Sequence, residues 1–154
     1  MSKTNRKIRA LVFEDDEGIR RILERVLERK NYEVFSFADP SFCPLYSDSE
    51  CICASSQICS DVILSDIKML KVDGLTFVKE QIEKGCKVHI DNIAMISGYW
   101  TDSLLKEARE LKLKIFYKPF SIAIIDKWLG ECSKNIDIEK ELIESSYFEK
   151  SNEK

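Results

Sequence analysis

Residues 61–74 read Asp61-Val-Ile-Leu-Ser-Asp66-Ile-Lys-Met-Leu-Lys-Val-Asp73-Gly74. The run from Val62 to Leu64 is short, apolar and β-branched, which is typical of a buried strand, and Asp66 follows it closely. Four more runs of this kind lie at Ile8 to Phe13, Val34 to Phe37, Ile93 to Ile96 and Ile115 to Tyr117. The sequence therefore predicts five strands.

The segments between these runs have the apolar spacing of amphipathic helices. Apolar residues recur at helical intervals in four places, which start at Ile19, Leu75, Leu104 and Ile122. Because parallel strands need crossover connections, alternating strands and helices favour an α/β fold, a doubly wound five-stranded parallel sheet covered on both faces. At 154 residues the chain has room for one such domain, which we expect over residues 1–133.

Two segments depart from this alternation. Residues 38–60 contain Pro40, Pro44 and four cysteines without a helical stripe, so the second helix of the alternation is absent or much reduced there. Residues 134–154 are expected to form a C-terminal helical extension and a polar tail, with the apolar side of the helix made by Ile136, Ile138, Leu142, Ile143, Tyr147 and Phe148.

Composition excludes several classes of function. Lys and Arg number 24 against 27 Asp and Glu, so the net charge is −3, which disfavours a nucleic-acid partner. The longest apolar runs fall well short of a membrane span, and the basic, polar start predicts a cytoplasmic protein. His89 is the only histidine. This disfavours a hydrolase with a Ser-His-Asp triad and a metal site with several histidine ligands.

Chemically active side chains follow the ends of the predicted strands. Glu14 and Asp15 follow the first, Asp66 the third, Ser97 the fourth and Lys118 the fifth. The carboxyl ends of parallel strands share one edge of the sheet, where ligands bind. Two carboxylates about 4 Å apart repel each other by about 4 kcal/mol. A divalent cation together with a lysine can offset this repulsion. Oxygen ligands suit Mg²⁺, so the pattern indicates phosphoryl chemistry.

In these features the sequence resembles the receiver domains of two-component response regulators. The resemblance rests on Leu11-Val-Phe-Glu14-Asp15-Asp16-Glu17, on residues 61–74 and on Lys118-Pro119-Phe120, in that order, and it spans residues 7–129. It implies a flavodoxin-like topology with strand order 2-1-3-4-5. It further implies a stand-alone phospho-accepting receiver that catalyses only its own phosphorylation and dephosphorylation.

The resemblance also assigns roles to individual residues. Asp66 would accept the phosphoryl group, and Glu14 and Asp15 would hold Mg²⁺ with Asp66 and the backbone carbonyl of Lys68. Ser97 would bind a phosphoryl oxygen, and Lys118 would neutralise phosphoryl charge. The implied partners are a sensor histidine kinase or phosphotransfer protein, which supplies the phosphoryl group, and a downstream protein target. A homodimer is compatible with this reading.

The sequence departs from the family pattern at several positions. Leu70 stands where the family usually has proline, and Ile115 stands where it has a switch aromatic, a role left to Phe116 or Tyr117. The variable positions that tune hydrolysis of the acyl phosphate are Lys68 and Tyr99.

The cysteine-rich segment lies outside the resemblance. Cys43, Cys51, Cys53 and Cys59 would suffice for a tetrahedral Zn²⁺ site, and the metal would order a loop that lacks an apolar face. An iron–sulfur cluster, disulfides and free thiols stay open. Cys86 and Cys132 are expected to be inert thiols, although Cys86 is placed where it could approach the base of this loop.

Two other functions compete with the receiver. An aspartate-nucleophile phosphatase also uses a strand-end aspartate with Mg²⁺, but it places that residue on the first strand and needs an acid where Lys68 stands. The second alternative is a metal- or redox-sensing binding module that acts through the cysteine loop.

Overall fold

The computed structural model describes residues 6–53 and 57–149. The strands are β1 (Arg9–Phe13), β2 (Glu33–Phe37), β3 (Gln57–Ile58), β4 (Val62–Asp66), β5 (Ile93–Ser97), β6 (Lys114–Tyr117) and β7 (Glu141–Leu142). The α-helices are α1 (Glu17–Arg29), α2 (Pro44–Ser47), α3 (Gly74–Glu83), α4 (Asp102–Glu110), α5 (Ile122–Cys132) and α6 (Ser145–Phe148). Short 3₁₀ turns occupy Pro40–Phe42, Ile90–Asn92 and Ser133–Asn135. None of the helices in the described residues is long and apolar enough to cross a membrane.

Five parallel strands form the main sheet in the order β2-β1-β4-β5-β6. This confirms the predicted doubly wound fold and the strand order 2-1-3-4-5, with β4, β5 and β6 as its third to fifth strands. The carboxyl ends of β1, β4, β5 and β6 consequently lie at one edge, where the predicted site residues follow.

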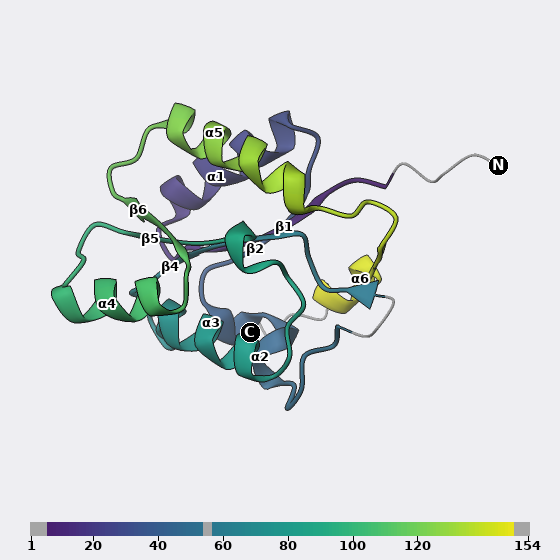
Figure 1. Cartoon of the computed structure of the whole chain (residues 1–154), viewed down its shortest axis with the longest axis horizontal. Helices are drawn as coiled ribbons and strands as arrows, with labels where there is room; N and C mark the ends of the chain where they lie inside the picture. The colour runs from purple at the N-terminus through teal and green to yellow at the C-terminus, as the bar shows by residue number, and fades with distance from the viewer. Residues whose placement is uncertain (1–5, 54–56, 150–154) are drawn as a thin grey trace.

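The sheet is buried on both faces (Figure 1). Helices α1 and α5 cover one face, and α3 and α4 lie on the other. The residues of β1 alternate between the two sides, because Ala10 and Val12 belong to the core under α1 and α5, while Leu11 and Phe13 belong to the core under α3. Packing in both cores thus fixes the register of the strands, and the register positions the candidate site residues at the strand ends.

Side-chain caps begin the helices that leave the carboxyl edge. Asp16, Asp73, Thr101 and Ser121 each accept a hydrogen bond from a backbone N–H in the first turn of α1, α3, α4 and α5. Such caps satisfy N–H groups that have no partner inside the helix, and they define where each loop ends. The loops around the candidate site are therefore short and anchored.

The second helix of the alternation is reduced, as predicted. A 3₁₀ turn and the four-residue α2 replace it, and a proline starts each of them. The chain then reaches β3, which pairs with β7 from the C-terminal segment rather than with the main sheet. This small second sheet was not foreseen.

The predicted amphipathic helix over residues 136–148 is wrong. The segment instead forms β7 and the single-turn α6. Its apolar side chains are used differently, because Ile143 donates its backbone N–H to Ile58, and Phe148 is buried and stacks on Phe35 with ring centroids 5.0 Å apart. The segment packs into the main core, and a domain division at residue 133 stays a prediction.

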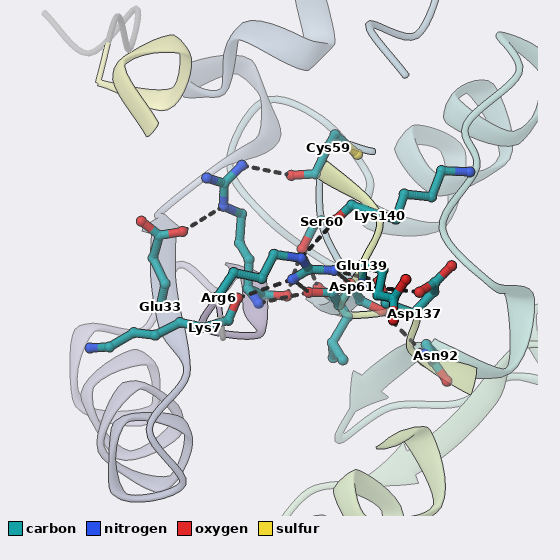
Figure 2. Close-up of polar contacts among 12 residues, drawn as sticks. Arg6, Lys7, Glu33, Cys59, Ser60, Asp61, Asn92, Asp137, Glu139 and Lys140 are labelled. Carbon is teal, nitrogen blue, oxygen red and sulfur yellow. Dashed lines mark hydrogen bonds and ion pairs between the residues drawn. The ribbon is translucent and has the colours of Figure 1, made fainter. Parts of the chain in front are cut away.

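Charged contacts clamp the same segment to the start of the sheet (Figure 2). Arg6 forms two hydrogen bonds with the Asp61 carboxylate, at 2.8 and 3.0 Å, and also donates to the backbone oxygens of Asp137 and Lys140. Asp61 in turn accepts a hydrogen bond from the backbone N–H of Arg9 at 2.9 Å. The bidentate pair with Asp61 orients the Arg6 guanidinium, which fixes the C-terminal segment through hydrogen bonds to its backbone carbonyls.

We predict that Phe148→Ala lowers the free energy of unfolding by about 3 kcal/mol, since it empties a buried aromatic site. Urea denaturation measures this loss. Ile138→Ala, at a half-exposed position on the same segment, should change stability far less. Equal effects of the two substitutions would show that the segment does not pack as described.

Candidate functional site

Glu14 follows β1 and is turned into the protein by its backbone contacts. Its backbone N–H donates to Phe37 at the end of β2, and its carbonyl accepts from the Arg20 guanidinium at 2.7 Å. The backbone N–H of Asp16 donates to the Glu14 carboxylate at 3.1 Å. As a result, Glu14 is only 1% exposed, whereas Asp15 beside it is exposed.

Asp66 ends β4 and is 7% exposed. Its Oδ1 accepts a hydrogen bond from the backbone N–H of Ile67 at 2.6 Å. Gly74, the first residue of α3, lies so close that a Cβ there would stand 1.8 Å from the Asp66 carbonyl oxygen. Glycine is therefore required at position 74 for α3 to begin against the acid-bearing strand end.

Lys118 joins the two buried acids across the sheet. It follows β6, and its backbone N–H donates to the carbonyl of Ser97. Its Nζ lies 2.9 Å from Asp66 Oδ2 and 3.0 Å from Glu14 Oε1. The lysine predicted from the sequence thus contacts two of the three acids predicted with it, Glu14 and Asp66.

Burial controls the protonation of this group. Burial first, and then the charge of Asp66, raise the pKa of Glu14 from 4.5 to about 7, although hydrogen bonding to Lys118 acts in the opposite direction. Burial also acts to lower the pKa of Lys118, but its contacts with Asp66 and Glu14 outweigh burial and raise it. One lysine therefore offsets the repulsion between the acids only in part.

The acids fit a divalent metal ion. Carboxylate oxygens of Glu14, Asp15 and Asp66 lie within 4.8 Å of one another. Glu14 Oε1 is buried and accepts no hydrogen bond within the described residues, although the Lys118 ammonium is near. A carboxylate oxygen has two lone pairs, so the ion pair with Lys118 leaves this atom able to bind a metal ion as well. The exposed Asp15 side leaves room for the waters that Mg²⁺ keeps.

Ser97 and Lys68 lie at the same edge of the sheet. Ser97 ends β5, is 4% exposed, and its Oγ accepts a hydrogen bond from the backbone N–H of Tyr99 at 3.1 Å. Lys68 lies in the loop between β4 and α3 with its side chain exposed. The contribution of its carbonyl to metal binding stays a prediction, as does the binding of a phosphoryl oxygen by Ser97.

The aromatic residues of β6 divide between the core and the surface. Phe116 is buried against Trp128, with ring centroids 5.6 Å apart. Tyr117 is 54% exposed and packs edge-on to Trp100, whose indole N–H donates to the Phe116 carbonyl. Of the two aromatic residues considered for the switch position, Tyr117 is the exposed one.

Sequence reasoning missed one buried acid that supports the site. Asp39 follows β2, and its Oδ2 accepts hydrogen bonds from the backbone N–H groups of Lys71 and Val72, at 2.7 and 3.2 Å. Burial acts to raise the pKa of Asp39, but backbone hydrogen bonds, first that of Ser41, lower it overall. An ionised Asp39 therefore holds the loop that follows Asp66. A lone aspartate beside Pro40 gave no signal of this role.

The cysteine prediction needs one correction. The four sulfurs that meet belong to Cys51, Cys53, Cys59 and Cys86, and we call these residues the cysteine cluster. Cys43 is not among them, because it is fully buried in the core at the start of α2. Cys86 takes its place from the loop after α3, which only the folded chain brings near.

Known proteins share this fold. Chemotaxis protein CheY4 of Vibrio cholerae is 23% identical, covers 82% of this chain and 99% of its own, and superimposes with a TM-score of 0.64. The N-terminal domain of protein WS1339 from Wolinella succinogenes is 24% identical, covers 83% of this chain and 95% of its own, and has a TM-score of 0.66. The BeF3-activated DrrB receiver domain is 15% identical, covers 84% of this chain and 99% of its own, and has a TM-score of 0.65. The chain has the receiver fold.

One curated protein is similar in sequence. Protein-glutamate methylesterase/protein-glutamine glutaminase 2 of Hahella chejuensis is 40% identical over 78 residues, which are 49% of this chain and 19% of that protein. The receiver-like chain therefore matches a small part of that enzyme's length. No protein-family model matches the chain.

We predict that Glu14→Gln changes how the stability of the metal-free protein depends on pH. Because the pKa of Glu14 is raised, folded Glu14 keeps a proton that the unfolded chain loses between pH 4.5 and about 7. Stability should therefore fall as the pH rises through this range, and Glu14→Gln should remove roughly 1–3 kcal/mol of that fall.

Urea denaturation in the presence of a chelator, at about pH 5 and about pH 8, measures the effect. Glu17→Gln, at an exposed position on α1, should leave the pH dependence as it is. An unchanged pH dependence in Glu14→Gln would contradict the burial of an ionisable group at this position.

Proposed function

We propose that this chain is a signalling receiver that accepts a phosphoryl group on Asp66. The observation that carries the proposal is the Lys118 ammonium, which contacts both Asp66 and Glu14 at the carboxyl edge of a receiver sheet. The receiver fold gives this arrangement its context, since structures of the same fold include the receiver domain of the hybrid histidine kinase CckA.

The reaction needs one new bond and one broken bond. An Asp66 oxygen attacks the phosphorus of a phosphohistidine on a partner, the P–O bond forms, and the P–N bond breaks as the imidazole leaves. Ile67 and Lys118 hold the Asp66 carboxylate from its two oxygens, which orients the attack. Such transfer depends mainly on in-line positioning and on neutralisation of charge.

Charge neutralisation is shared by side chains and a metal ion. Lys118 remains beside the phosphoryl group, and the hydroxyl of Ser97 donates to one of its oxygens. Glu14, Asp15 and Asp66 would hold Mg²⁺ together with the Lys68 carbonyl, and Mg²⁺ would supply electrostatic stabilisation of the phosphoryl oxygens. The chain then acts as a phospho-acceptor rather than as an enzyme with a separate substrate.

The donor and the reader of the signal are other proteins. We infer a sensor histidine kinase or phosphotransfer protein as donor, and a downstream protein as target, in the cytoplasm. A candidate surface for the target contains Tyr99, which is 72% exposed, and the neighbouring pair Trp100 and Tyr117. Tyr99 and Trp100 lie two and three positions after Ser97, and Tyr117 directly precedes Lys118, so a shift at Ser97 or Lys118 reaches them directly.

The position of Asp66 argues against the phosphatase alternative. A phosphatase of that type has its nucleophile on the first strand, whereas Asp66 ends β4, the third strand of the main sheet. Lys68 also occupies the position where that type needs its acid.

Incubation with acetyl phosphate and Mg²⁺ should add one phosphoryl group to the chain, detected by intact-mass spectrometry and located on Asp66 by borohydride reduction and peptide mapping. Asp66→Asn should abolish the adduct. The matched control is Asp73→Asn, since asparagine still caps α3 and the substitution is the same. Continuous release of phosphate without an adduct would favour the phosphatase, and neither result would favour the sensing module.

Lys118→Gln should separate the two roles of the lysine. Loss of the ammonium should slow phosphorylation of Asp66 by about 10²-fold or more, because charge stabilisation of the transferring group is lost. The same substitution should raise the affinity for Mg²⁺ several-fold, since it removes a competing cation from the acids.

Mass spectrometry over time and isothermal titration calorimetry measure these two effects. Lys106→Gln, at an exposed position on α4, should alter neither. A parallel fall in both quantities would indicate that Lys118 only maintains the fold.

A further inference from the structure

The cysteine cluster brings together three separate parts of the chain. Cys51 and Cys53 follow α2, Cys59 precedes β4, and Cys86 follows α3. Their sulfur atoms all lie within 4.8 Å of one another, and the Cys59 and Cys86 sulfurs are 4.0 Å apart. All four are free thiols, so no disulfide explains their approach.

We propose that the cysteine cluster is a structural Zn²⁺ site with four thiolate ligands. A tetrahedral zinc with Zn–S bonds of about 2.3 Å places its ligand sulfurs about 3.8 Å apart. The observed spacings are within a small side-chain adjustment of this value. Four sulfurs that all lie within 4.8 Å of one another can surround a single tetrahedral ion.

The spacing of the sulfurs also favours a zinc site over an iron–sulfur cluster or a disulfide. An iron–sulfur cluster places two or more iron atoms between its thiolates, which spreads the sulfurs beyond the spacing of a mononuclear site. A disulfide requires one pair at about 2.05 Å and has no need of the other two sulfurs. Soft thiolate ligands also exclude the Mg²⁺ that suits the acidic site.

Backbone N–H groups support negative charge on the sulfurs. The N–H of Cys59 donates to the Cys53 sulfur at 3.2 Å, and the N–H of Lys87 also donates to this sulfur. The N–H of Cys53 donates to the Cys51 sulfur. Zn²⁺ with four thiolates carries a net charge of 2 − 4 = −2, and such N–H donors stabilise ligands of this kind.

Hydrogen bonds also position the backbone around the cluster. Arg9 donates from its guanidinium to the carbonyl of Cys59 at 3.1 Å. The N–H of Cys51 donates to the carbonyl of Lys84 at 3.1 Å, and the N–H of Cys86 donates to that of Gln81 at 3.0 Å. Each ligand-bearing segment is thus tied to the sheet or to α3, which lowers the entropy cost of metal binding.

The location of the cluster defines its role. Four protein ligands leave no open coordination position, which is the arrangement of structural rather than catalytic zinc. The cluster lies beyond the amino-terminal end of β4, and Asp66 lies at the opposite end of that five-residue strand, which is about 13 Å long at about 3.3 Å per residue step. The zinc therefore orders the segment that replaces the second helix and takes no part in phosphoryl transfer.

The test begins with the full-length protein, purified without added metal or chelator. Elemental analysis should find one zinc ion per chain, and replacement by Co²⁺ should give the intense thiolate charge-transfer and visible bands of a tetrahedral cobalt site. Alkylation followed by peptide mapping should show that chelation of the metal exposes Cys51, Cys53, Cys59 and Cys86 together. These measurements on the unaltered protein do not depend on whether any variant folds.

Variants then assign the ligands. Cys51→Ser and Cys86→Ser should each lose the bound zinc and the cobalt bands, whereas Cys43→Ala and Cys132→Ala should keep them. Phosphorylation of Asp66 by acetyl phosphate should persist in zinc-depleted protein that remains folded.

Four results would overturn the proposal. They are iron with acid-labile sulfide in place of zinc, a mass that shows disulfides, reactive thiols without any bound metal, and loss of zinc in Cys43→Ala with retention in Cys86→Ser.

Discussion

The contact of Lys118 with the buried carboxylates of Glu14 and Asp66 is the interaction on which the candidate site depends. Two buried acids without this ammonium would repel each other strongly, and the pKa of Glu14 is raised even in its presence. With Asp15 included, three ionised carboxylates and one lysine leave a net charge of 1 − 3 = −2. A divalent cation would match that charge, which supports our proposal that the acids and the lysine form one metal and phosphoryl site.

The fold supplies this contact through strand order. Lys118 and Asp66 are 52 residues apart in the chain, yet β5 alone separates their strands in the sheet. The loop after Asp66 is then held by Asp39 from the neighbouring side and by the absence of a side chain at Gly74. The acid therefore lies on a rigid strand end, with its surroundings fixed by backbone hydrogen bonds rather than by mobile side chains.

Prediction from sequence succeeded where the signal was local and periodic. The five strands, their order and the convergence of Glu14, Asp66 and Lys118 followed from apolar runs, the residues after them and the resemblance to receivers. It failed where distant segments decide the outcome. Residues 136–148 have helical spacing, but pairing of β7 with β3 and burial of Phe148 against Phe35 override that local preference.

The cysteines show the same limit. Cys43 is close in sequence to Cys51, but its burial at the start of α2 removes it from the cluster, and Cys86 enters from beyond α3. The spacing of cysteines along the chain does not indicate which of them face the core.

Helix α3 lies between the acidic site and the cysteine cluster. It begins at Gly74 against Asp66 and ends beside Cys86, so the acidic site adjoins its first turn and the cysteine cluster its last. Negative charge at the carboxyl end of a helix is unfavourable, because the helix dipole has the same sign there. Lys84 lies at that end, and its ammonium donates to the carbonyls of Leu45 and Tyr46 in α2. This lysine thereby ties the end of α3 to the short helix α2. The short second helix is thus held against α3 by hydrogen bonds, and coordination in the zinc site that we propose would add to them where an apolar helical stripe is lacking.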